Sequence, residues 1–359
     1  MIKKAHLLFA LLTLLPFPAF ARDCAEKDLN VAMTSPLTNM PVLDQDGSGS
    51  CYGHSAATLI NYELLANGGA PFTGIHPLYG AWVEKYVNST IKSDGLDSGE
   101  AVDVISSLKK KGYCSEIEVE KRLKKLKVDC AKGTTDAQLL HILELIYDNY
   151  SSFSFNPYAN AVESAKKARA SKKDYHITDC QIESVAAELR LKDMINIPAT
   201  ALLSKLFEGC KHEDLKVGEP KEEHIGSDEH MLNNVDNALN RDKPAEISIC
   251  SKMFTDPNFK LNGVLPSVNR GSLLNIPSGC GGHSVVITGR KNVGGTCKYL
   301  LRNSWGSLWK ADTATECACI LNTGKYLDVC PDASIVREYL GCWFKEDILG
   351  KNIFGTTSF

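Results

Sequence analysis

Thirteen cysteines among 359 residues constrain this chain more than any other feature of its sequence, and all of them lie beyond residue 21. An odd number leaves at least one cysteine without an intramolecular partner. If one thiol is kept for chemistry, twelve cysteines remain, enough for six disulfide bonds. Metal binding is a weaker explanation, because there is no C-x-x-C motif, and Cys317 and Cys319 have no second pair at zinc-finger spacing. We therefore expect a disulfide-bonded protein with one reserved thiol and no metal.

The N-terminus has the pattern of an export signal. Two lysines precede a short apolar run at 7–17, and the sequence Ala-Phe-Ala follows, ending at Ala21. A basic region, an apolar region of this length and an A-x-A site describe a secretory signal peptide, cleaved after Ala21. No later stretch reaches about 18 consecutive apolar residues, so we expect no membrane anchor. The expected location is secreted or periplasmic, where disulfide bonds persist.

The charge balance excludes one class of function. Lys and Arg number 40 and Asp and Glu number 43, which gives a net charge of −3. This near balance argues against a nucleic-acid-binding protein that relies on a strongly basic surface. No nucleotide-binding loop stands out, so we expect no organic cofactor, and we expect a monomer.

The periodicity of the sequence changes from helical to strand-like along the chain. Apolar residues recur at helical spacing in three early segments, at 51–67, 78–87 and 99–112. Lys-rich amphipathic stretches follow and predict a helical subdomain, and from Pro244 the pattern predicts strands. Helices first and strands later predict an α+β protein. The expected helices of the subdomain are 117–126, 137–147, 159–170, 182–191 and 199–206, and the expected strands are 245–250, 283–288, 297–302 and 339–344.

The segment from Gln45 to Tyr52 is the strongest local feature. Glycines and serines lead directly into a helix with Cys51 at its first turn. The free N–H groups and positive dipole of a helix N-terminus favour a thiolate over a thiol, so this is a suitable place for a reactive cysteine. The alternative is that Cys51 is half of a disulfide, like most of the other cysteines.

A thiolate nucleophile also needs an acid–base partner and a group that orients this partner. His283 is the best placed of the nine histidines, because it stands at the head of an apolar strand. Asn303 follows 20 residues later, where another predicted strand ends. Two adjacent strands would bring the Asn303 amide beside the His283 ring, and the Trp305 indole could shield that bond from water.

These segments, in this order, resemble the papain and cathepsin cysteine proteases. The matching residues are Ser48-Gly49-Ser50-Cys51-Tyr52, Gly282-His283 and Asn303-Ser304-Trp305-Gly306. The resemblance implies a papain-like two-lobed α+β fold, with a helical left lobe, an antiparallel β right lobe and here an added helical subdomain. The implied division is 1–21 signal peptide, 22–114 helical lobe with the nucleophile helix, 115–230 helical insertion and 231–359 β-rich lobe.

The resemblance also implies a role for each site residue. Cys51 is the nucleophile, His283 the general base and acid, and Asn303 the group that orients His283. Gln45 would donate its side-chain amide to the oxyanion, together with the Cys51 backbone N–H. Implied substrate-binding residues are Ser98 and Gly99 in a glycine-rich wall, together with Gly282 and Trp305.

The sequence departs from the family pattern in ways that define open questions. Ser48 and Leu96 replace both cysteines of one familiar disulfide, so the pair is lost as a unit. The separation of Cys51 and His283 is 232 residues, longer than the family norm by the length of the helical insertion. Only about 25 residues separate the signal from the Gln45 motif, which leaves no room for an inhibitory propeptide. His54, one helical turn after Cys51, is expected to pack rather than to tune the site.

The expected function is that of a secreted cysteine endopeptidase that acts on protein or peptide substrates through a Cys51 thioester. A non-catalytic binding or adhesion protein on the same scaffold is the first alternative, although such proteins typically lose the nucleophile, the histidine or the glutamine. Thiol acyl transfer to an amine is the second alternative, and it would use the same residues. The helical insertion could gate the cleft, recognise substrate or merely stabilise the fold.

Overall fold

The computed structural model describes residues 24–31, 35–45, 49–70, 74–87, 96, 99–126, 157–169, 177–188, 212–223, 228–256, 280–314, 316–331 and 333–359, with a few single residues between 138 and 210. The predicted signal peptide and Ser98 lie outside the described residues. So does most of the predicted helices 137–147 and 199–206. All structural statements below concern the described part of the chain.

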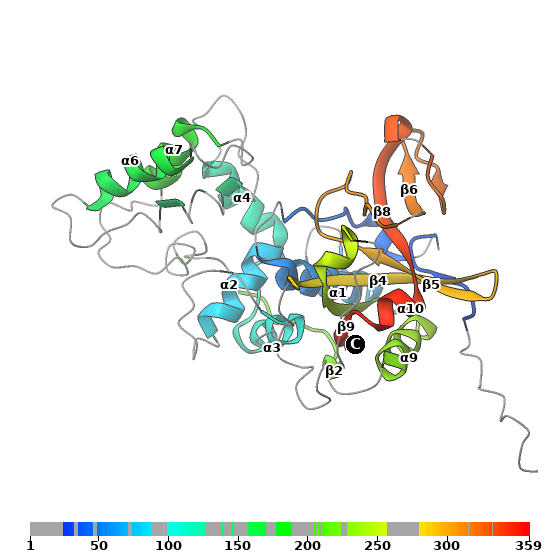
Figure 1. The fold of residues 1–359 in the computed structure, drawn as a ribbon. Helices are drawn as coiled ribbons and strands as arrows, with labels where there is room; N and C mark the ends of the chain where they lie inside the picture. The colour runs from blue at the N-terminus through cyan, green and yellow to red at the C-terminus, as the bar shows by residue number, and fades with distance from the viewer. Residues whose placement is uncertain are drawn as a thin grey trace, which may run out of the picture.

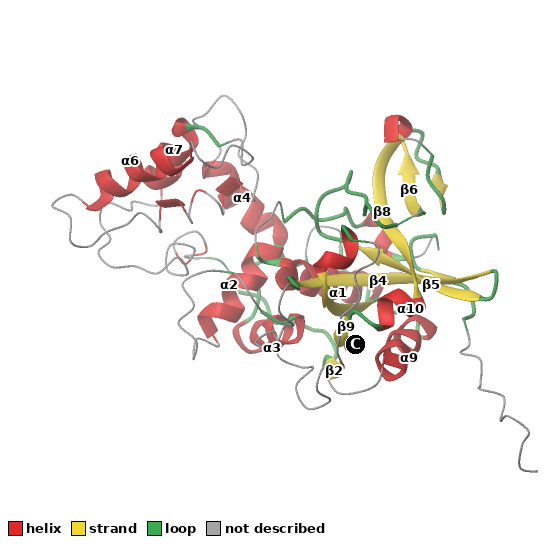
Figure 2. Cartoon of the chain, in the orientation of Figure 1, coloured by secondary structure: helices red, strands yellow, loops and turns green. Residues whose placement is uncertain are grey.

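The chain has the predicted α+β architecture, with a helical part beside an antiparallel sheet (Figure 2). The strand order is β2-β9-β3-β4-β5-β8-β6-β7, and β1 pairs with β4. Strand β3 pairs with β4 on one edge and with β9 on the other. The strands are β1 Lys27–Asp28, β2 Lys221–Glu223, β3 Ala245–Cys250, β4 Gly282–Val293, β5 Thr296–Arg302, β6 Cys317–Leu321, β7 Tyr326–Leu327, β8 Val336–Lys345 and β9 Ile353–Ser358.

The helices agree with the sequence-based expectation in most of the segments that are described. The three early helices and three of the subdomain helices form where apolar spacing predicts them, with small shifts at their ends. Helices α9 and α10 and strands β1, β2, β6, β7 and β9 were not predicted. The helices are α1 Cys51–Ala66, α2 Pro77–Val87, α3 Ala101–Lys111, α4 Glu116–Leu126, α6 Pro157–Arg169, α7 Asp179–Glu188, α9 Asp228–Asn240 and α10 Glu346–Gly350, with short 3₁₀ turns at Pro36–Asn39, Ser251–Phe254 and Ala333–Ile335.

Two hydrophobic cores meet at strand β4. Val285 and Ile287 belong to the core of the sheet, whereas Val286 belongs to the core of the helices. Because successive side chains of a strand point to opposite faces, β4 is buried on both faces. Helix α1 lies beside β4 in Figure 1, packs against it and is buried over most of its length. The fold thereby places the N-terminus of α1 beside the start of β4.

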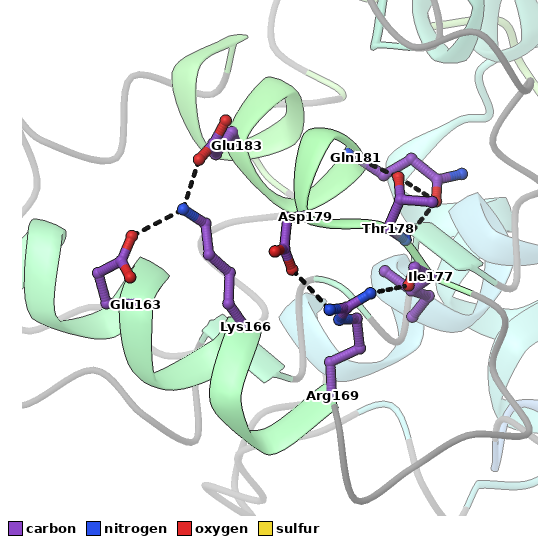
Figure 3. A network of polar contacts seen from close by, with 8 residues as sticks. All are labelled: Glu163, Lys166, Arg169, Ile177, Thr178, Asp179, Gln181 and Glu183. Atoms are coloured by element: carbon purple, nitrogen blue, oxygen red, sulfur yellow. Dashed lines mark hydrogen bonds and ion pairs between the residues drawn. The ribbon is translucent and has the colours of Figure 1, made fainter.

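Helices α4, α6 and α7 lie to one side of the sheet (Figure 1), yet their apolar side chains belong to the same core as those of α1 to α3. Polar contacts join α6 to α7 (Figure 3). Lys166 bonds both Glu163, at 2.7 Å, and Glu183. Arg169 bridges to Asp179 at 2.9 Å. Thr178 and Gln181 form a capping box at the start of α7, as Figure 3 shows.

Disulfide bonds account for every described cysteine except Cys51, which is a free thiol. The expectation of one reserved thiol among many disulfides is confirmed for this part of the chain. Cys250–Cys280 joins the end of β3 to the segment that leads into β4. Cys180 is disulfide-bonded as well. The five bonds with both partners described are Cys24–Cys297, Cys114–Cys210, Cys250–Cys280, Cys317–Cys342 and Cys319–Cys330.

Candidate active site

Cys51 is the first residue of α1, as predicted, and the residue is partly buried. Burial raises the pKa of the Cys51 thiol to about 11. The nearby backbone N–H groups of Ser284 on β4, and of Tyr52 and Cys51 in the first turn of α1, act in the opposite direction and lower it in part. Cys51 is therefore held between a helix N-terminus and the strand that carries His283.

His283 and Asn303 are brought together by neighbouring strands. His283 is the second residue of β4, and Asn303 directly follows β5, which pairs with β4. The His283 Nε2 and the Asn303 Oδ1 atoms are 2.7 Å apart, and both side chains are about 4% exposed. The Ser304 backbone N–H donates to the same Asn303 oxygen at 2.8 Å. Because that oxygen only accepts, Nε2 carries the ring proton, and the neutral ring leaves Nδ1 as its basic nitrogen.

Aromatic rings enclose the His283–Asn303 pair. The Trp305 ring lies 4.7 Å from the His283 ring between centroids, tilted by 35°. Phe254 meets both rings edge-on, at 5.8 Å from His283 and 5.5 Å from Trp305. This apolar enclosure lowers the pKa of His283 to about 4, because burial disfavours the charged imidazolium. The hydrogen bond to Asn303 acts in the opposite direction.

Gln45 is fixed by residues next to Asn303. The backbone N–H of Gln45 donates to the Ser304 carbonyl at 2.7 Å, and Asp44 pairs with Trp305 as an isolated antiparallel bridge. The Ser304 hydroxyl donates to Gln45 Oε1. With its oxygen engaged in this way, the side-chain amide of Gln45 keeps its NH₂ group as a donor. The sequence indicated Ser304 only as part of the Asn303-Ser304-Trp305-Gly306 motif and did not predict its contact with Gln45.

The glycine-rich wall is described only at Leu96, Gly99 and beyond. A Cβ on Gly99 would lie 2.4 Å from Cε2 of the Tyr52 ring. The Tyr52 hydroxyl donates to the Leu96 carbonyl at 2.8 Å. Glycine is needed at 99 because the ring of the residue after Cys51 packs there, a reason the sequence-based interpretation did not include. Gly282, at the start of β4, pairs with Cys250 of β3.

His54 is held by the first turn of its own helix. Its Nδ1 lies 3.0 Å from the carbonyl oxygen of Ser50, and its side chain is buried. His54 also lies close enough to His283 to lower the pKa of His283 by charge repulsion. It therefore combines the expected packing with an electrostatic influence on the site.

Neither a metal site nor a membrane span is found in the described part of the chain. No group of three or more His, Cys, Asp or Glu side chains there is arranged to hold a metal ion. None of the described helices is long and apolar enough to cross a membrane.

Comparisons with known proteins give remote matches among solved structures. No protein-family model matches the chain, and a search of curated protein sequences found no match. Xylellain, a cysteine protease from Xylella fastidiosa, matches at 13% identity and a TM-score of 0.43 over 92% of this chain and 84% of that one. A recombinant stem bromelain precursor matches at 12% and 0.40, over 93% and 69%. Digestive procathepsin L 3 of Tenebrio molitor matches at 12% and 0.39, over 92% and 73%.

Proposed function

We propose that this protein is a cysteine-type peptidase that hydrolyses peptide bonds through a Cys51 thioester. One observation carries the proposal: the free cysteine in the described part of the chain starts a helix beside the strand of His283, and His283 is bonded to Asn303. A half-cystine at position 51 would have removed the nucleophile. The resemblance of the surrounding motifs to papain-like proteases supports the same reaction.

In the proposed first half-reaction, His283 Nδ1 takes the thiol proton while the sulfur attacks the peptide carbonyl carbon. The carbonyl oxygen becomes an oxyanion that accepts hydrogen bonds from the Gln45 side chain and the Cys51 backbone N–H. His283 then gives its proton to the departing amine, the C–N bond breaks and a thioester remains. In the second half-reaction, His283 takes a proton from water and the resulting hydroxide attacks the thioester carbon. The C–S bond breaks, the acyl group leaves as a carboxylic acid, and His283 returns its proton to the Cys51 sulfur.

The burial of the two reacting groups fits this sequence of steps. Burial raises the pKa of Cys51 and lowers that of His283, so each charged form is unfavourable by itself. Transfer of the proton from sulfur to imidazole creates two opposite charges that stabilise each other. The hydrogen bond to Asn303 favours the imidazolium and holds the ring with Nδ1 available.

The finer assignments extend the proposal. Ser98 and Gly99 would form one wall of the substrate cleft, and Gly282 and Trp305 would contact the peptide near the scissile bond. Residues 115–230 would form an insertion between a helical lobe and a β-rich lobe. We place the protein outside the cytoplasm, secreted or periplasmic, and the disulfide bonds support this placement.

Peptide cleavage by wild type and by Cys51→Ser tests the proposal. Both proteins are incubated with an unfolded protein substrate in mild reductant, and new peptide termini are identified by mass spectrometry. The proposal predicts internal cleavage by wild type alone. Cleavage that persists in Cys51→Ser would overturn it. The incubation is repeated with an added amine. New peptide C-termini that are amides of this amine, in place of free carboxylates, would identify acyl transfer. Absence of any turnover by the folded wild type would favour a binding protein.

A further inference from the structure

A polar cluster lies on the face of the sheet that looks toward α1. It consists of Glu246 and Ser248 on β3, Ser284 on β4 and Thr357 on β9. Ser248 is paired with Ser284, and Glu246 is paired with Thr357. The intervening Ile247 and Ile249 belong to the core of the sheet, so the polar residues of β3 point to the other face. The proposed reaction above gives none of these side chains a task.

Glu246 is the centre of this cluster and is only 1% exposed. Its Oε1 accepts hydrogen bonds from the hydroxyls of Ser284, at 2.8 Å, and Ser248, at 3.0 Å. The Thr357 side chain donates to the carboxylate as well. Among the described residues, no lysine or arginine forms an ion pair with Glu246. A buried carboxylate held only by hydroxyl groups is costly in its charged form.

Ser284 connects Glu246 to the nucleophile. Its side chain donates to the carboxylate, whereas its backbone N–H lies close enough to the Cys51 sulfur to lower the pKa of the thiol. The negative charge of Glu246 also reaches Cys51 directly and raises the pKa of the thiol. Glu246 thus acts on Cys51 in two ways, through a bonded neighbour and through its charge.

We propose that Glu246 is a positioning residue for the nucleophile: it fixes Ser284 against the Cys51 sulfur, and its ionisation makes the thiolate harder to form. This inference rests on the proposed function only in taking Cys51 as the nucleophile. When the carboxyl group gains a proton, the repulsion disappears while a group of the same shape still holds Ser284. The thiol then becomes more reactive relative to a site with an ionised carboxylate.

The environment of Glu246 places this change near neutral pH. Burial raises the pKa of Glu246 to about 7, and the hydroxyls of Ser284, Thr357 and Ser248 lower it only in part. Glu222 on β2 is the charged group that acts on Glu246, and its negative charge raises the pKa further. On α1 the facing titratable group is Cys51 itself. Glu246 is therefore neutral in mildly acidic solution and ionised in mildly alkaline solution.

The test is the rate of Cys51 alkylation by iodoacetamide from pH 5 to pH 9, in wild type and in Glu246→Gln. Glutamine keeps the shape and an acceptor oxygen but never ionises. We expect equal rates at pH 5.5, and above pH 7 a faster rate in the variant, on the order of tenfold, the factor that corresponds to a change of one in the thiol pKa. Glu63→Gln is the matched control, because Glu63 is also buried, lies on α1 and pairs with Lys243.

A ratio of variant to wild-type rates that rises through pH 7 supports the proposal, and a ratio that does not change with pH overturns it. A second comparison uses Ser284→Ala and the double variant Ser284→Ala/Glu246→Gln. It keeps the test decisive if Glu246→Gln alone folds poorly. Loss of the serine hydroxyl should raise the pKa of Glu246 and move the divergence to higher pH; an unmoved divergence contradicts the link through Ser284. Alkylation needs no peptidase activity, so a pH-dependent ratio in a protein that cleaves no peptide would leave this inference standing and remove the proposed function.

Discussion

The imidazole of His283 and the amide oxygen of Asn303 are joined by a 2.7 Å hydrogen bond that the protein buries. The bond determines which ring nitrogen is free, because an amide oxygen accepts and cannot donate. It also opposes the effect of burial, which by itself would keep His283 neutral under nearly all conditions. The usefulness of His283 as a base therefore depends on Asn303.

Replacement of Asn303 by Ala should lower kcat with little change in KM. The ring remains but loses its fixed orientation. We therefore expect a loss of about 10-fold to 100-fold, below most of the ~10²–10⁴-fold range that general acid–base catalysis contributes, because the base itself is still present. Asn352→Ala is the matched control, because Asn352 is also buried and its side-chain amide bonds the backbone carbonyl of Ile348 on α10 and not a residue of the proposed catalytic set. Steady-state kinetics is measured on the folded fraction of each variant. Equal losses of kcat in the two variants would mean that Asn303 has only a structural role.

The contact between Ser304 and Gln45 predicts a non-additive pair of substitutions. Gln45→Ala should lower kcat by about 10²–10³-fold, the usual cost of one oxyanion donor. Ser304→Ala should cost less, since the glutamine is present but no longer held by the hydroxyl. Because Ser304 acts through Gln45, the double variant should be no slower than Gln45→Ala alone. If the fold-losses in kcat of the two single variants multiply in the double variant, Ser304 acts independently of Gln45.

Packing against Tyr52 predicts that Gly99→Ala destabilises the protein. The added Cβ would lie within 2.7 Å of three atoms of the Tyr52 ring, so the ring or the wall must move. Overpacking of this kind typically costs about 1–3 kcal/mol. Since Tyr52 follows Cys51, activity per folded molecule should fall too. In Gly218→Ala the new Cβ has only an ordinary contact with Phe359, so denaturant unfolding of this control should match wild type.

The pH dependence of stability should report on Glu246. A pKa raised from 4.5 to about 7 on folding means that the folded protein binds the extra proton between these values. The contribution of Glu246 is therefore fully present below pH 4.5 and is lost as the pH rises through 7, by up to ~3 kcal/mol. Glu246→Gln does not titrate and escapes this loss. Thermal unfolding at pH 5 and pH 8 should show that the stability of the variant relative to wild type is greater at pH 8 than at pH 5. If the difference in stability is the same at both pH values, the carboxyl group does not titrate in this range.

Local patterns predicted the parts of the site that lie within single segments. The helix that begins at Cys51 follows from apolar spacing after a Gly- and Ser-rich loop, and the strand of His283 follows from a continuous apolar run. The meeting of His283 with Asn303 required only that consecutive strands pair, which is the commonest arrangement.

Contacts between distant segments could not be predicted in this way. Ser304 and Gln45 are separated by 259 positions, and neither segment contains a pattern that predicts a hydrogen bond between their side chains. Glu246 was also missed, because a charged residue in a strand normally faces solvent. Here α1 covers that face, so the carboxylate is buried. Strand β9 was not predicted, because its glycine and threonines do not give a clear alternation of apolar and polar residues.

Labelling of Cys51 by an electrophilic epoxide probe for thiol proteases tests the central claim most directly. The mature protein is treated in mild reductant and analysed by intact and peptide mass spectrometry, beside Cys51→Ala and His283→Ala. An activated nucleophile predicts one adduct, located on Cys51 and absent from both variants. A folded protein whose free Cys51 remains unlabelled, or one labelled equally with and without His283, would contradict the assignment of Cys51 and His283 as a catalytic pair.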